Sequence, residues 1–333
     1  MLLRQLEYLV ALARERHFAR AAAACFVSQP SLSAGIRKLE RELDVPIVQH
    51  GARFQGLTPE GERVLLWAHR ILGDRDALQQ EIAAMHGRLT GTLRLGAIPT
   101  ALTVTSLLTT PFCERHPEAG VRLESLSSRE IMRRLAEFEI DAALTYLDDE
   151  TLQGVHKLPL YEERYVLLTP EDEPVTADGD GDGYAGSPGD SDGYAGSTGD
   201  GEEVVSWSQA ARLPLCLLSP RMRNRRILDG LFAADGASVS PAVESDTVDG
   251  LYAHLASGRW SSVISHAWLH MFGIPAGMRV VRLHGDGDSR PRVGLVFAAH
   301  EPRPAMVRAL LEVAEGARVR DSLDELLSAH LGS

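Results

Sequence analysis

The chain has 333 residues, enough for two or three domains, and 44% of them are hydrophobic. No run approaches the roughly 18 consecutive apolar residues of a membrane-spanning helix. Arg4 and Glu7 also interrupt the first apolar stretch, so we expect a cytoplasmic protein with neither a membrane span nor a signal peptide. The formal charge is −12, but residues 1–70 hold ten basic and seven acidic residues, a balance of +3 that leaves −15 for residues 71–333. A basic head on an acidic body is typical of a local DNA-binding surface.

Three helices are predicted in the head. Apolar residues recur at helical spacing over 2–14, alanines dominate a second helix at 18–26, and a third begins at Ser28 or Gln29. Ile36, Leu39 and Leu43 are expected to face inward. The outer face of the third helix is short, polar and basic, and with the helix start it comprises Ser28, Gln29, Pro30, Ser31, Ser33, Arg37 and Lys38.

Two helices joined by a short turn, the second with a polar start, form the helix-turn-helix pattern. Gln29 can read adenine, and Ser31 and Ser33 can contact bases or phosphates, because short polar side chains let the helix approach base edges. Arg37 and Lys38 are expected to lie near phosphates. Residues 45–58 read as two short strands around a wing that presents Arg53 to DNA. The alternative is a small protein-binding head whose charges are simply solvated.

Residues 2–72 resemble the N-terminal domain of the LysR-type transcriptional regulators. The resemblance is carried by the alanines of the second helix, "SQPSLS", the pattern I-R-K-L-E-x-x-L, and "LTPEG". It departs from the family pattern at His17, Asp44, Ile47-Val48 and His50. The resemblance implies a winged helix-turn-helix that binds double-stranded promoter DNA and contacts RNA polymerase.

A long connector helix is predicted from Thr58, a capping residue, to about Arg88. Apolar residues spaced alternately by four and three, interrupted at Arg75, indicate a coiled-coil seam for dimerisation. Its members are Val64, Ala68, Ile71, Leu78, Ile82 and Met85. The alternative is a helix packed on its own body. The resemblance favours an antiparallel linker-helix homodimer, assembled further into a homotetramer.

Alternating strand and helix patterns after residue 91 indicate an α/β body. We expect two lobes, with the chain crossing near 164 and returning near 267. The resemblance to LysR-type effector domains implies a two-lobe fold similar to type 2 periplasmic binding proteins. The expected domains are therefore a DNA-binding head (1–58), a linker helix (59–90) and an effector domain (91–333). In the effector domain, lobe 1 comprises about 91–163 and 267–333, and lobe 2 about 164–266.

A ligand in such a fold lies between the lobes, beyond the carboxyl ends of strands. The candidate residues by position are Thr100, Ser127, Ser128, Tyr146, Ser219, Asn224, Arg225, Thr247 and His266. Thr100 and Ser128 are expected at helix N-termini, which favour anions, and "RMRNRR" (221–226) adds cations. The pattern favours a small anionic effector.

A ten-residue repeat lies within a Gly/Asp/Ser-rich insert at about 176–203, where we expect a disordered surface loop. "DGDGDG" begins like a calcium loop, but Gly189 stands where the ligating glutamate is required. No cofactor or bound metal is expected.

Two other functions remain open. A thiol-based redox sensor would use Cys113 and Cys216. A metal-dependent hydrolase would use His266 and His270, but the HExxH and GxSxG motifs are absent, so an enzyme is not expected.

Overall fold

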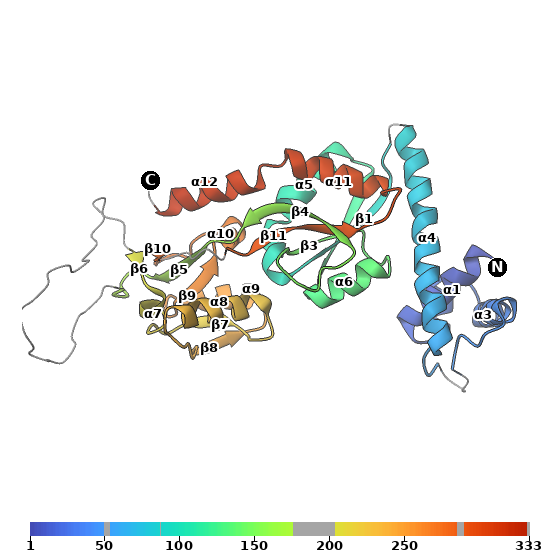
Figure 1. Ribbon diagram of the computed structural model, residues 1–333, viewed down its shortest axis with the longest axis horizontal. Coiled ribbons are helices and arrows are strands. Elements are labelled where there is room, and N and C mark those ends of the chain that lie inside the picture. Colours follow the sequence, from blue (N-terminus) through green and yellow to red (C-terminus); the bar gives the residue numbers. More distant parts are fainter. Residues whose placement is uncertain (50–53, 87, 176–203, 285–289, 332–333) are drawn as a thin grey trace, which may run out of the picture.

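The computed structural model describes residues 1–49, 54–86, 88–175, 204–284 and 290–331. The molecule is elongated, with a helical head at one end, a two-lobe body at the other and one long helix between them (Figure 1). The predicted fold class is confirmed: a helix-turn-helix head, a linker helix and a two-lobe α/β domain.

The head contains α1 (Leu3–Glu15), α2 (Phe18–Ala24) and α3 (Gln29–Leu43). Ser28 caps α3, because its Oγ accepts the Ser31 N–H at 3.3 Å, and Pro30 suits the first turn. Ile36 and Leu39 are buried as expected, whereas Leu43, the last residue of α3, is 38% exposed. Where two short wing strands were predicted, the described residues form one antiparallel β-bridge, between Val48 and Leu57.

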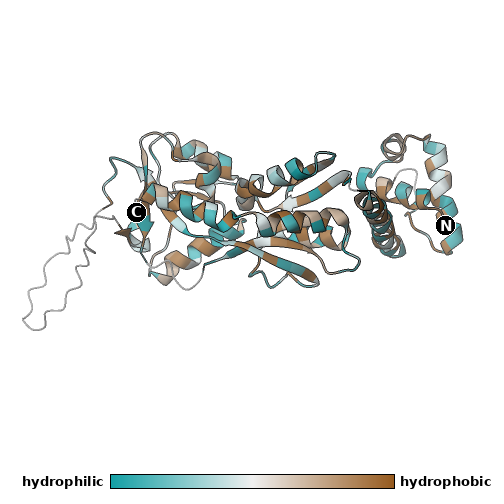
Figure 2. Cartoon of the chain, turned by 90° about the horizontal axis from the view of Figure 1, so that it is seen from above, coloured by the Kyte–Doolittle hydropathy of each residue, from teal (hydrophilic) through white to brown (hydrophobic). Residues whose placement is uncertain are grey.

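The linker helix α4 (Pro59–Met85) starts at Thr58, whose Oγ1 accepts the Gly61 N–H at 2.9 Å. Its first half packs on the head: Ala68 is fully buried, and Val64 and Ile71 join the same apolar cluster as Leu6 and Leu9 of α1. In Figure 2 α4 is seen nearly end-on between the head and the body, and both hydrophilic and hydrophobic residues appear on it.

Lobe 1 is a mixed five-stranded sheet with the order β2-β1-β3-β11-β4. β1 is parallel to β2 and β3, and β11 is antiparallel to β3 and β4. Its elements are β1 (Gly91–Ala97), the 3-10 helix η1 (Pro99–Val104), α5 (Ser106–Arg115), β2 (Ala119–Ser125), α6 (Ser128–Ala136), β3 (Ala142–Tyr146), β4 (Val155–Glu162), β11 (Arg292–Ala298), α11 (Ala305–Gly316) and α12 (Val319–Leu331).

Lobe 2 is built on the sheet β6-β10-β5-β9 and the parallel pair β7-β8. Its elements are β5 (Tyr165–Pro170), β6 (Val204–Val205), α7 (Trp207–Ala210), β7 (Cys216–Leu218), α8 (Arg223–Ala234), β8 (Val243–Ser245), α9 (Val248–Leu255), β9 (Ser262–Ser265), α10 (Ala267–Phe272) and β10 (Met278–Leu283).

The chain enters lobe 2 between β4 and β5 and returns to lobe 1 only between β10 and β11. The predicted return near 267 is therefore too early, because β10 still pairs with β5, with Val280 opposite Leu168. A short alternating strand fits either sheet, so its sequence does not reveal this choice. The predicted insert (176–203), Arg53 and His50 lie outside the described residues.

Candidate DNA-binding and effector sites

The outer face of α3 is open to solvent. Ser28, Gln29, Pro30 and Ser31 are exposed at its N-terminus. The Ser28 and Ser31 hydroxyls lie 2.8 Å apart, and Gln29 is the first residue of α3.

Further along α3, Arg37 and Lys38 are also exposed, and Ser33 is half-buried. Lys38 lies 3.9 Å from Glu42, a loose exposed pair that contributes little to stability and leaves the ammonium accessible. The residues predicted to face DNA are therefore accessible, Ser33 only in part.

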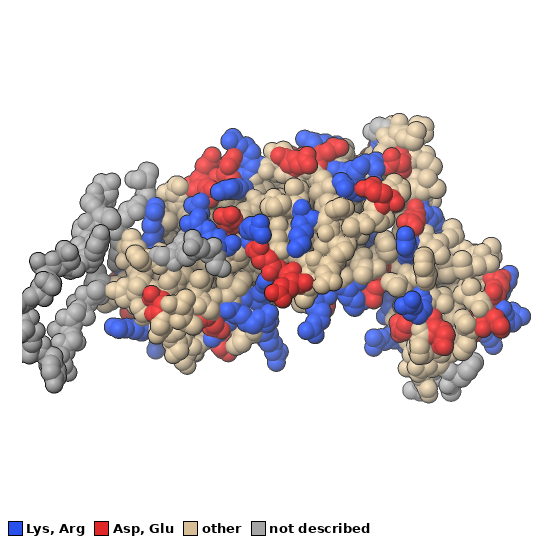
Figure 3. Space-filling model, in the orientation of Figure 1, with Lys and Arg blue, Asp and Glu red and all other residues tan. Residues whose placement is uncertain are grey.

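The charge distribution along the sequence does not produce an evenly acidic body. Lys and Arg side chains occur on the head at lower right and also along the lower edge of the body (Figure 3). A positive surface alone therefore does not distinguish the head from the body as a candidate DNA-binding part. The exposed polar N-terminus of α3 does.

Part of the predicted dimer seam is not available to a partner. Ala68 has no exposed surface, because α1 of the same chain covers it, and Val64 and Ile71 pack in the same cluster. The structure therefore contradicts the seam role of Ala68, and the spacing of the half-buried Val64 and Ile71 also serves packing on the head. Leu78, Ile82 and Met85, in contrast, are 61%, 50% and 80% exposed.

Arg75, the polar member of the seam, also binds within the chain. Its guanidinium pairs with Glu7 of α1 and lies 2.7 Å from Asp76 of α4 itself. The ion pair with Glu7 adds to the apolar packing that holds α4 against the head.

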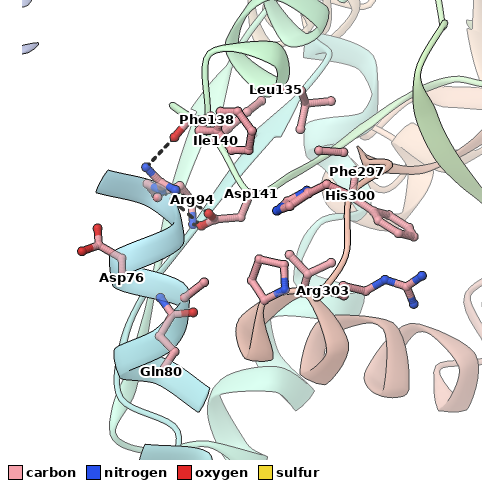
Figure 4. A pocket seen from close by; sticks show the side chains of 15 residues that line it. Asp76, Gln80, Arg94, Leu135, Phe138, Ile140, Asp141, Phe297, His300 and Arg303 are labelled. Atoms are coloured by element: carbon pink, nitrogen blue, oxygen red, sulfur yellow. Dashed lines mark hydrogen bonds and ion pairs between the residues drawn. The ribbon is translucent and has the colours of Figure 1, made fainter. Parts of the chain in front are cut away.

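α4 meets lobe 1 at a small cavity of about 40 Å³ (Figure 4). Gln80 of α4 lies on one side of it, and the Arg94–Asp141 ion pair and His300 lie on the lobe 1 side (Figure 4). Arg94 binds Asp141 Oδ1 at 2.5 Å. A cavity of this size holds only a few waters, so it is too small for an effector. It lies within the contact between the linker helix and lobe 1.

Three predicted effector residues meet at the junction of the lobes. The Asn224 amide nitrogen lies 3.4 Å from the Tyr146 hydroxyl, and Thr100 Oγ1 lies 3.4 Å from the same hydroxyl. Tyr146 and Thr100 belong to lobe 1 and Asn224 to lobe 2. All three side chains are buried.

Sequence reasoning missed the centre of this cluster, Glu163. The Tyr146 and Tyr165 hydroxyls donate to its Oε2 at 3.0 and 2.7 Å. Burial raises the pKa of Glu163 to about 7, and the hydrogen bonds from Tyr165 and Tyr146 oppose that rise. The only sequence signal was an acidic residue between two apolar strands.

Arg223 belongs to the basic stretch 221–226 that was expected to add cations, but it was not named as a single candidate. It lies in the first turn of α8, pairs with Asp149 of lobe 1 and donates to the Asp148 carbonyl at 3.1 Å. Its guanidinium lies 5.5 Å from the centre of the Tyr146 ring. A cation therefore bridges the two lobes beside the buried cluster.

Four further candidates lie at helix starts or strand ends. Ser127 caps α6, and Thr247 caps α9. Ser128 Oγ lies 3.3 Å from Thr145 Oγ1, and Ser219 donates to Asp246 at 2.5 Å.

Arg225 and His266 are occupied within the protein. Arg225 pairs with Asp229 at 2.7 Å and Glu244 at 3.0 Å and donates to the Leu218 carbonyl. His266 Nδ1 accepts the Arg164 N–H at 3.1 Å, and burial lowers its pKa to about 4. These contacts hold Arg225 and His266 within lobe 2.

The alternative chemistries find little support at the residues proposed for them. Cys216 is buried on β7, and burial raises the pKa of its thiol to about 11, whereas Cys113 is exposed on α5. Among the described residues, no group of three or more His, Cys, Asp and Glu side chains is placed to hold a metal. His270 Nε2 lies 3.5 Å from Ser106 Oγ, and His266 is already bonded to Arg164.

A helix-turn-helix head joined by a long helix to a two-lobe domain defines a DNA-binding transcriptional regulator. Residues 3–62 match the family model for bacterial regulatory helix-turn-helix proteins of the lysR family, and residues 86–181 and 196–318 match the LysR substrate binding domain. The chain belongs to the LysR family. It is a regulator that acts on double-stranded DNA, and it is not an enzyme.

Curated relatives match about half of the chain. A probable hydrogen peroxide-inducible genes activator from Mycobacterium xenopi is 35% identical over 167 residues, which are 50% of this chain and 88% of that protein. The dual regulator OxyR of Escherichia coli K12 is 33% identical over 175 residues, 52% of this chain and 57% of that protein. The match to OxyR therefore spans less than two thirds of its length.

Solved structures match along almost the whole chain. A full-length OxyR variant from Pseudomonas aeruginosa has a TM-score of 0.70 at 25% identity, covering 96% of this chain and 97% of that one. CbnR in complex with its target DNA has a TM-score of 0.61 at 20% identity, covering 95% and 100%, which shows the fold alone. Across the described part of the chain, no helix combines the length and apolarity needed to cross a membrane.

Proposed function

We propose that this regulator binds an imperfect inverted repeat as a homodimer or homotetramer, and that a small anionic effector bound between the lobes changes the DNA geometry presented to RNA polymerase. The observation that carries the proposal is the exposed polar tip of α3 on a chain whose body closes around a buried polar cluster. The exposed apolar residues of α4, Leu78, Ile82 and Met85, support self-association through the distal half of the linker helix.

Arg223 supports the anionic character of the effector. It is a cation in the first turn of a twelve-residue helix, where backbone N–H groups also favour negative charge. In this structure the Asp149 carboxylate pairs with Arg223. An effector carboxylate or oxyanion would take the place of the Asp149 carboxylate on Arg223, beside the Tyr146 ring.

A thiol switch between Cys113 and Cys216 is the second candidate, because several relatives are named hydrogen peroxide-inducible genes activators. The raised pKa of the buried Cys216 thiol opposes it, since the thiolate is the reactive form. A small-molecule effector therefore fits these residues better than a switch between these two thiols.

The first experiment is a footprint of the full-length protein on the DNA flanking its own gene, over a series of salt concentrations. Two adjacent protected patches, with affinity falling steeply as salt rises, are expected for a dimeric reader that neutralises phosphates. Absence of protection at low salt by a folded protein would contradict the proposal.

Variants then test the reading face. Gln29→Ala and Ser33→Ala should reduce the preference for the operator by about 1–3 kcal/mol and leave non-specific binding unchanged. Arg37→Ala should weaken binding to all sequences and flatten the salt dependence. Equal losses of specific and non-specific binding in every variant would contradict the assignment of roles.

The effector is sought by thermal-shift screening of small carboxylates and oxyanions with the full-length chain. Arg223→Ala should abolish the shift caused by any hit without altering the salt dependence of operator binding. A hit that stabilises the variant and the wild type equally would place the effector elsewhere.

A further inference from the structure

The turn between α2 and α3 ends in an exposed aromatic side chain. Phe26 is 95% exposed, more than any other large hydrophobic residue among the described part of the chain. Two residues later Ser28 caps the recognition helix. Three residues of chain span at most about 11 Å, so the ring lies within a few base pairs of whatever Gln29 contacts.

The backbone at Phe26 is one that a bulky residue rarely adopts. α2 ends in a Schellman motif: the Phe26 N–H donates to the Ala23 carbonyl at 3.1 Å and the Val27 N–H to the Ala22 carbonyl at 3.0 Å. The motif places Phe26 in the left-handed region, with φ at +55°. Glycine or asparagine usually occupies this position because a larger side chain strains the backbone there.

A second phenylalanine shows what normally offsets such strain. Phe138 also has φ at +55°, but its ring packs edge-on against His300, with centroids 5.4 Å apart, and lies against Gly73 of α4. Its side chain is half-buried. Phe26 combines the same backbone conformation with almost complete exposure, so burial within the chain does not offset it.

We propose that Phe26 is a DNA-contacting residue whose ring packs on a thymine methyl group in the major groove, beside the bases contacted by the N-terminus of α3. The C5-methyl of thymine is the apolar feature of the major groove, and phenylalanine is one of the side chains that contacts it. The contact would bury the exposed ring only in the complex. This inference rests on operator binding by the head and adds a base preference that the polar residues of α3 do not supply.

The test uses the full-length chain and a duplex recovered from a random pool by binding selection. Each thymine in the selected half-site is replaced by deoxyuridine, which lacks only the C5-methyl. At one position the wild type should lose about fourfold in affinity per half-site, the effect of burying one methyl-sized group. Phe26→Asn should bind the thymine duplex about fourfold more weakly per half-site, and the deoxyuridine substitution should then have no further effect.

Thermal unfolding separates this role from a structural one. Asparagine tolerates the left-handed backbone, so the unfolding midpoint of Phe26→Asn should equal or exceed that of the wild type. Leu43→Asn is the matched control, because Leu43 is an exposed apolar residue at the opposite end of α3. Leu43→Asn should bind the thymine duplex with wild-type affinity and should lose the same affinity as the wild type when thymine is replaced by deoxyuridine.

Three results would overturn the inference. Phe26→Asn could retain both full affinity and sensitivity to deoxyuridine, or it could weaken binding while no methyl removal affects the wild type. It could also lower the unfolding midpoint, which would assign Phe26 to the fold of the head. Failure of the wild type to select any duplex would instead contradict operator binding itself.

Discussion

Replacing Glu163 by glutamine should change how stability depends on pH. Glu163 is 1% exposed, and its Oε2 accepts hydrogen bonds from tyrosines of both lobes, Tyr146 at 3.0 Å and Tyr165 at 2.7 Å. Burial raises the pKa of Glu163 from its ordinary 4.5 to about 7. The folded protein therefore holds this proton more tightly than the unfolded chain does.

The sign follows from that difference. The protonated Glu163 contributes its full stabilisation below pH 4.5, and the contribution is lost as pH rises through about 7. The separation of the two pKa values corresponds to about 3 kcal/mol in the free energy of unfolding. For a domain of this size that is roughly 6 °C or more in the thermal midpoint.

The measurement is the thermal midpoint of the wild type and Glu163→Gln from pH 4.5 to 8. Glutamine does not titrate, so the thermal midpoint of Glu163→Gln should rise relative to that of the wild type as pH rises. Its altered hydrogen bonds add only an offset that does not change with pH. Glu162→Gln, a change at the half-buried neighbouring residue, is the control and should run parallel to the wild type. A constant difference between Glu163→Gln and the wild type over this range would refute the reasoning.

Three shorter predictions concern other regions. Leu78→Glu with Ile82→Glu should convert the self-associated protein to monomer in sedimentation experiments, because both side chains are at least half exposed; an unchanged oligomer would contradict the proposed interface. Gly61→Ala should lower the thermal midpoint, because a Cβ there would overlap the Ile47 carbonyl oxygen, and an unchanged midpoint would show that the linker start can shift freely. Cys216→Ser should leave the footprint and its response to peroxide unchanged, since the thiol is buried with a raised pKa; loss of a wild-type peroxide response would revive the thiol switch.

Local chemistry made the head predictable. The Ser28 cap, Pro30 in the first turn and the inward spacing of Ile36 and Leu39 act within a few residues of each other, and the helix forms as expected. The linker helix is similarly set by the Thr58 cap and its helical pattern. Phe26 was not singled out, because its exposure and left-handed backbone are properties of the folded turn.

The partner of a side chain was less predictable. The apolar residues of α4 do recur at a spacing that suits packing on another helix. A repeat of 3.5 residues does not say whether that helix belongs to the same chain, and here α1 of the same chain covers Ala68. Arg225 followed a strand as an effector residue should, yet Glu244 and Asp229 already neutralise it. Charge pairing across a fold depends on distances that sequence spacing does not contain.

The sequence by itself determined the class of protein, the order of its parts and the polar tip of the recognition helix, because these depend on caps, periodicity and a motif read over short distances. Only the tertiary structure decided that β10 belongs to lobe 2 and that Tyr146 and Asn224 meet around Glu163. It also decided that Arg223 spans the lobes. The contacts of Tyr146 with Glu163 and with Asn224 join residues 17 and 78 positions apart, where chain topology, and not local preference, sets which groups share a buried environment.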